Sequence, residues 1–236
     1  MQPQPPPDAP APPPSEAALR SQRWWRWTCV VGLFSIVGLL VFSSRPVVIR
    51  SHRKSDQTEA VNNVRQIGLA LFEFDTEYGK YPDATTISAV RRKAGSLLPL
   101  GKKSSNDFFR QLIAADIVRS ESMFYSKING CRKPDNRIEA GKALAKSECG
   151  FSYLAGLSSK GNPSRPLIVT PLIPGTIRFD PTRFQGKAII LRMDNSVTSM
   201  PINGAGHVMS NGMNLLDPAN PVWGGGDKFT IAWPDL

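Results

Sequence analysis

The stretch NNVRQIGLALFEFDTEYGKYPD, from Asn62 to Asp83, decides the fold that this sequence predicts. Apolar residues recur here at spacings of three and four, which places them on one face of a helix. The residues of this face are Val61, Val64, Ile67, Leu71, Phe74 and Tyr78. The pattern stops at Gly79 and Pro82, residue types that commonly follow a helix C-terminus. We therefore expect a spine helix whose apolar face packs against the rest of a domain.

An uncharged apolar run lies upstream of the spine helix. It extends from Trp27 to Ser44 and is long enough for a spanning helix of about 17–25 residues. Trp24, Trp25 and Trp27 cluster at its start, where indole rings favour the headgroup layer. We expect a transmembrane helix over residues 24–44, then a membrane-proximal and spine helix over 45–78 with a kink at Pro46. The Pro- and Ala-rich residues 1–22 are expected to be disordered.

A cleaved signal peptide is the main alternative to this anchor. Arg20, Arg23 and Arg26 would form its basic region, and the small residues near Ser43 its cleavage site. The long tail and long apolar run favour the uncleaved anchor. Basic residues lie on both sides of the run, so their count does not decide the orientation. A short tail inside and a large domain outside is the simpler topology.

A long N-terminal helix that is half membrane span and half domain spine resembles type IV pilins and type II secretion pseudopilins. The stretch from Asn62 to Pro82 is similar to a pattern of pilin-like secretion proteins from the Planctomycetes–Verrucomicrobia group. NDFFRQLIAADIV with ESMFY, and GKAIILRMDNSV, also resemble segments of those proteins. The resemblance implies a single-pass protein of the bacterial inner membrane with its globular domain in the periplasm. It also implies that the bilayer and other pilin-like or secretion-system subunits are its partners.

The sequence departs from that family at the usual prepilin peptidase site. Precursors of the family carry a Gly before the apolar helix and a Glu shortly after its start. Here no Gly occurs between Glu16 and Trp27, and no acidic residue occurs between Glu16 and Asp56. We expect a subunit that does not polymerise in the usual way, or a pilin-like domain kept as a permanent membrane anchor.

The remainder, residues 79–236, is expected to be a pilin-like globular domain. Asn106 or Asp107 would cap a helix through FFRQLIAADIV, and residues 137–147 would form another short helix. Strand patterns follow in FSYLAG, PLIVTPL, TIRF, KAIILRM, SVTSM and FTIAW, with Asp194-Asn195 at a hairpin turn. The predicted class is α+β, in which a long N-terminal helix packs on a C-terminal antiparallel sheet.

Two cysteines frame a polar segment of this domain. Cys131 and Cys149 are expected to pair in an exported protein, and a disulfide between them would stabilise the fold by roughly 3 kcal/mol. Two unrelated thiols are the alternative. The spacing suits no zinc site, because no second pair and no nearby His exists.

The net charge of +10 favours contact with anionic partners. The basic residues of the globular domain that could form an anionic-ligand surface are Arg91, Arg92, Lys93, Lys102 and Lys103. Because acidic and polar residues interrupt them, an ordinary solvated face is the simpler interpretation. The alternative is a binding module for DNA or acidic polysaccharide.

The sequence carries no recognisable catalytic constellation. No nucleophile elbow and no phosphate-binding loop occurs, and His207 is interpreted as a loop residue. Asp217, Asp227 and Asp235 are candidate calcium ligands, because calcium prefers clustered carboxylates, but they follow no calcium-loop spacing. We therefore predict no enzyme activity, no cofactor and no metal ligand. The predicted function is structural, within a type II secretion or type IV pilus-like assembly.

Overall fold

A computed structural model describes the chain over residues 16–224 and 229–236, although the side chains of residues 16–23, 25–29 and 37–53 are not described. Helix α1 runs from Glu16 to Tyr78 and continues through Pro46. The chain divides into two compact units, Met1–Arg50 and Ser51–Leu236, and α1 contributes to both. Residues 16–22 of the tail that was expected to be disordered belong to α1, and residues 1–15 lie outside the described residues.

The first unit is described only as part of α1. Its described apolar side chains are largely exposed: Val30 43%, Val31 60%, Leu33 64%, Phe34 72% and Ile36 61%. Among the described residues, no helix has both the length and the apolar character needed to cross a membrane. Most side chains of the span predicted over 24–44 lie outside that described part, so the span stays a prediction.

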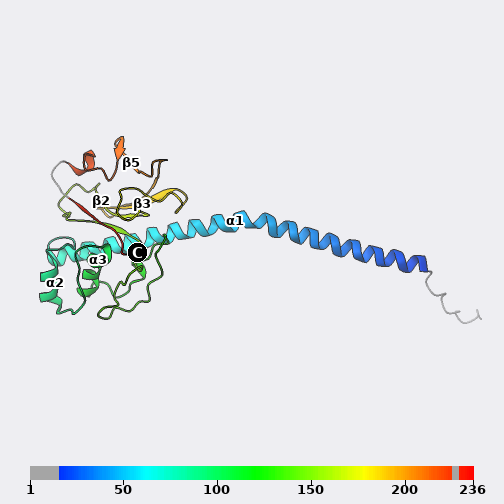
Figure 1. The fold of residues 1–236 in the computed structure, drawn as a ribbon, viewed down its shortest axis with the longest axis horizontal. Coiled ribbons are helices and arrows are strands. Elements are labelled where there is room, and N and C mark those ends of the chain that lie inside the picture. Colours follow the sequence, from blue (N-terminus) through cyan, green and yellow to red (C-terminus); the bar gives the residue numbers. More distant parts are fainter. Residues whose placement is uncertain (1–15, 225–228) are drawn as a thin grey trace, which may run out of the picture. The chain divides into compact units, whose positions relative to one another are not determined.

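The second unit is an α+β domain in which helices pack against a five-stranded antiparallel sheet (Figure 1). The strand order is β4-β3-β2-β1-β7, so β4 and β7 form the edges. The strands are β1 Ser152–Ala155, β2 Pro166–Thr170, β3 Lys187–Arg192, β4 Val197–Pro201 and β7 Thr230–Ala232. The short strands β5 Met209–Ser210 and β6 Met213–Asn214 form a separate hairpin.

Helices α1 and α3 cover the same face of the sheet. Tyr153 in β1 pairs with Ile168 in β2, which pairs with Leu191 in β3, so these side chains share one face. A Cβ added at Gly68 of α1 would lie 3.1 Å from Leu191, which shows how closely α1 approaches β3. On α3, Ser105–Ala114, the Phe109 ring lies 5.3 Å from the Tyr153 ring, measured between centroids.

The other face of the sheet is also buried. Val169 and Ile190 are paired on this face and are fully inaccessible. Figure 1 shows the segment around β5 on the side of β2 and β3 opposite to α2 and α3. Helix η2, Pro221–Trp223, belongs to this C-terminal segment, and the Trp223 indole N–H donates to the Leu215 carbonyl. Both faces of the sheet therefore contribute to one hydrophobic core.

Local hydrogen bonds stabilise the N-termini of the two short helices α2 and α3. Ser104 caps α3 in a capping box with Asp107, so the helix starts slightly earlier than the predicted caps Asn106 or Asp107. Before α2, Ile87–Ala94, the Asp83 carboxylate accepts hydrogen bonds from the Thr85 and Thr86 backbone N–H groups. These bonds satisfy donors that would otherwise lack a partner at a helix start.

Five of the six predicted strand segments contain a sheet strand, and TIRF does not. Its chain turns instead, with Ile173 donating its backbone N–H to the Arg178 carbonyl. Only an isolated bridge joins Leu172 to Phe179, because Pro174 and Gly175 force the turn. The predicted hairpin joins β3 to β4, and Asn195 at its turn has a φ of 62°.

The prediction of a short helix over residues 137–147 is wrong. The described chain forms turns there, and Gly141 and Leu144 have positive φ values of 81° and 46°. A right-handed helix cannot contain such residues in its interior. The Leu144 and Ala145 N–H groups instead donate to the carboxylates of Glu121 and Glu148.

Candidate functional site

The predicted spine residues lie where α1 meets the core. Val64, Ile67, Leu71 and Phe74 are fully inaccessible, and Val61 is partly buried against the core. Leu69, by contrast, is 59% exposed on the same helix. The helix therefore presents one buried face and one open face. Its role at this point is packing, because its core-facing side chains are apolar.

The predicted basic residues fall into two groups. Arg91, Arg92 and Lys93 occupy the last turn of α2, whereas Lys102 and Lys103 precede the cap of α3. The Lys93 ammonium is 2.8 Å from a Glu77 carboxylate oxygen and lies over the Tyr78 ring. Among the described residues, the other four cations have no ion-pair partner, and all four are exposed.

The two predicted disulfide partners are both free thiols in the structure. The Cys149 thiol is buried and lies 3.5 Å from the Ser105 hydroxyl, whereas Cys131 is partly exposed. Burial raises the pKa of Cys149 to about 12, and the charge of Cys131 contributes to this increase. The disulfide stays a prediction.

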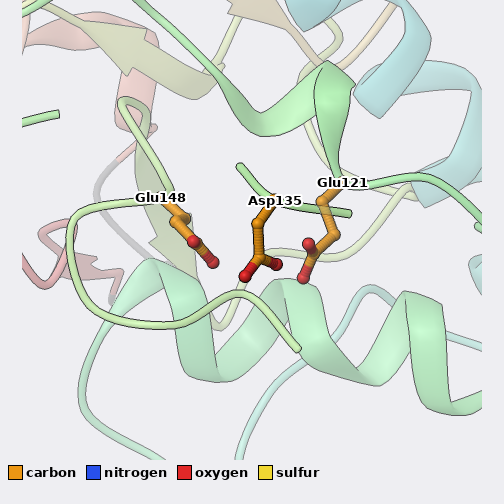
Figure 2. A group of neighbouring side chains, drawn as sticks. All are labelled: Glu121, Asp135 and Glu148. Carbon is orange, nitrogen blue, oxygen red and sulfur yellow. The ribbon is translucent and has the colours of Figure 1, made fainter. Parts of the chain in front are cut away.

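Three carboxylates converge beside these cysteines. Glu121 precedes η1, Ser122–Phe124, while Asp135 and Glu148 belong to the long connection between η1 and β1. One carboxylate oxygen from each lies within 4.8 Å of the other two. Figure 2 shows the Glu121 and Glu148 carboxylates pointing toward Asp135. We call these three residues the carboxylate cluster.

Backbone donors hold two members of the cluster in place. Leu144 donates its N–H to Glu121 Oε1, and Ala145 donates its N–H to Glu148 Oε2 at 2.9 Å. Asp135 Oδ1 accepts from the Arg137 N–H at 3.0 Å. One oxygen of each glutamate therefore accepts a backbone hydrogen bond, whereas the other accepts none from the described residues.

The cluster combines burial with negative charge. Glu121 and Glu148 are fully inaccessible to solvent, whereas the Asp135 side chain is 46% exposed. Burial raises the pKa of Glu121, and the charges of Glu148 and Asp135 raise it further. The Leu144 and Arg137 N–H groups act in the opposite direction but do not reverse the increase.

Arginine side chains neutralise the cluster only in part. Arg132 Nη2 lies 2.9 Å from Glu148 Oε1, so the two groups form an ion pair. They do not form a hydrogen bond. Arg137 Nε lies 3.9 Å from Asp135 Oδ2, at the limit of an ion pair. Both arginine side chains are about 60% exposed. Within the described residues, Glu121 forms no ion pair.

A second feature is an open groove of about 700 Å³ beside the edge strand β7. Its lining is mainly apolar and includes Leu216, Phe229 and Trp233, together with His207 and Arg178. His207 is thus a groove residue in a turn before β5. The candidate calcium ligands Asp217 and Asp235 do not belong to the carboxylate cluster, and Asp227 lies outside the described residues.

No sequence motif groups Glu121, Asp135 and Glu148. They are spread along an irregular connection without a calcium-loop spacing. The only local signal is that acidic residues lie close to Cys131 and Cys149 in the sequence. Their proximity depends on long-range folding of this connection over α3.

Comparisons with protein-family models, with curated proteins and with solved structures give no match to this chain. The second unit belongs to the α+β class, and the C-terminal part of helix α1 is one of its elements.

Proposed function

We propose that this chain is a membrane-anchored, pilin-like structural subunit of a type II secretion or type IV pilus-like assembly, without catalytic activity. The observation that carries the proposal is that the two parts of α1 belong to different units of the chain. Its C-terminal part is the buried spine of the α+β domain, and its N-terminal part belongs to a separate unit.

The exposed apolar side chains of the first unit support an anchor. Leu33, Phe34 and Ile36 are each more than half exposed on α1. Such a surface is unfavourable in water and marks contact with lipid or with another subunit. The uncharged sequence from Trp27 to Ser44 favours lipid.

Membrane partition of the full chain tests the anchor. We expect the unchanged protein to stay in the membrane fraction through a high-salt wash. The double variant Leu33→Asp, Phe34→Asp should move to the soluble fraction, because two charges in the hydrocarbon region cost several kcal/mol. Leu97→Asp is the matched control, since Leu97 is 89% exposed in the second unit and should not affect partition.

Two outcomes would contradict the anchor: an unchanged chain found in the soluble fraction, or a double variant that stays with the membrane. Chemical cross-linking in native membranes then tests assembly. A structural subunit should give products that contain neighbouring copies or pilin-like subunits, identified by mass spectrometry. A chain recovered only as a monomer would leave an anchor without an assembly and would contradict the structural role.

A binding module for DNA or acidic polysaccharide is the second candidate. Arg91, Arg92, Lys102 and Lys103 favour it, because they are exposed and form no ion pair with the described residues. Such binding would weaken steeply with salt, because phosphate or carboxylate contacts release counterions.

A further inference from the structure

We propose that Glu121, Asp135 and Glu148 form a binding site for a calcium ion. The three residues come from separated points of the chain, and their ligand oxygens lie within 4.8 Å of one another (Figure 2). A cation placed among them would contact all three carboxylates. This site is additional to the structural role proposed above and does not depend on it.

A buried atom without a partner points independently to a ligand. Glu121 is fully inaccessible, and its Oε1 accepts from the Leu144 N–H, but its Oε2 has no hydrogen-bond partner among the described residues. The nearby Arg137 N–H donates to Asp135 Oδ1 instead. A buried carboxylate oxygen without a donor is unfavourable. Because the Glu121 carboxylate points toward Asp135 in Figure 2, a cation in the cluster would supply the missing partner.

The arginines nearby do not fill this role. Arg132 reaches Glu148 and Arg137 approaches Asp135, but among the described residues no cation is paired with Glu121. Within the described part of the chain, no positively charged side chain therefore pairs with the free Oε2 of Glu121. The Arg132 side chain is 59% exposed, so it can move away from Glu148 when a metal ion binds.

The donor set selects a hard divalent cation, and calcium in particular. All three ligands are carboxylates, and hard cations prefer such oxygens. Calcium accepts about six to eight oxygen ligands in irregular geometry, whereas magnesium demands a near-ideal octahedron. The 46% exposure of the Asp135 side chain leaves room for water to complete the coordination shell. Zinc would instead favour His or Cys ligands.

Binding would fix the connection between η1 and β1. Asp135 and Glu148 lie on this connection, which has no regular secondary structure and includes positive-φ residues such as Asn136, Leu144 and Ser147. A shared ion would tie both residues to Glu121 at its start. We therefore expect calcium to stabilise the folded domain by binding the native state and not the unfolded chain.

The test uses the purified full chain after removal of metal with EDTA. Calorimetric titration with CaCl₂ should give one site, with a Kd on the order of 10⁻⁴–10⁻³ M, as in extracellular calcium modules. The Tm should rise with CaCl₂ and respond much less to MgCl₂. Asp135→Asn should weaken binding by about tenfold or more, because ligand charge sets calcium affinity.

Variants inside and outside the carboxylate cluster show whether calcium binds at this location. Asp135 is partly exposed, so Asp135→Asn should still fold, and Glu121→Gln should lose the calcium response. Asp116→Asn is the control, because Asp116 is an exposed carboxylate outside the cluster. No heat and no shift in Tm at millimolar CaCl₂ would overturn the proposal. An equal response to MgCl₂ would overturn the choice of calcium, and equal binding by the Asp135 and Asp116 variants would overturn the location.

Discussion

Leu69 and Leu71 of α1 have identical side chains but differ in their exposure to solvent. Leu71 is fully inaccessible in the core, whereas Leu69 is 59% exposed. The period of three and four in the sequence was enough to place Leu71 on the buried face. At this scale the sequence is informative, because the burial of a helical residue depends mainly on the side of the helix that it occupies.

The Leu71→Asp substitution should destabilise the domain by several kcal/mol, on the order of 4, because it buries an unpaired charge. Leu69→Asp should change the free energy of unfolding by less than about 0.5 kcal/mol. Urea unfolding of the fragment Ser51–Leu236, the second compact unit, provides the measurement. Equal denaturation midpoints for the two variants would show that α1 is not the spine of this domain.

At the scale of elements, the capping box of α3 links stability to pH. The Asp107 carboxylate accepts from the Lys103 and Ser104 N–H groups and from the Arg110 guanidinium. Burial acts to raise the pKa of Asp107, but these hydrogen bonds outweigh it and lower the pKa. A folded-state pKa below the unfolded value contributes stability above the unfolded pKa, and this contribution is lost as pH falls through the folded pKa.

The Asp107→Asn variant should therefore lose about 1 kcal/mol at pH 7, the typical effect of a lost cap. Its deficit relative to the unchanged protein should shrink below about pH 4, the unfolded pKa of Asp, where the unchanged carboxyl becomes protonated. Urea unfolding at a series of pH values measures both effects. Parallel stability curves for the two proteins would contradict a lowered pKa at Asp107.

Strands and short helices show where sequence patterns suffice and where they fail. The β-branched run in Lys187–Arg192 predicted β3, and Asp194-Asn195 predicted its turn, because both signals are local. The segment 137–147 misled, because its composition favours a helix while its N–H groups are used by Glu121 and Glu148. The carboxylate cluster could not be predicted from local patterns either. It forms only because folding brings distant parts of the chain together.

At the scale of the whole molecule, the proposed membrane anchor depends on the N-terminal part of α1. The helix begins at Glu16, upstream of the apolar run, and no Gly occurs between Glu16 and Trp27. A prepilin-type peptidase would need such a Gly, according to the family that the sequence resembles. The absence of an acidic residue from the apolar run also removes the usual partner for a new N-terminal amine.

We therefore expect the protein in its native membrane to retain the residues upstream of Trp24. N-terminal sequencing and intact mass of the purified protein provide the measurement. A new N-terminus between Trp24 and Val30 would indicate pilin-type processing at an unusual site and would favour an assembling subunit over a permanent anchor. A cut near Ser43 would remove the apolar run, leave a soluble exported domain and contradict the anchor. The fragment Ser51–Leu236 serves as the reference, because as a compact unit it should fold and stay soluble without the first part of α1.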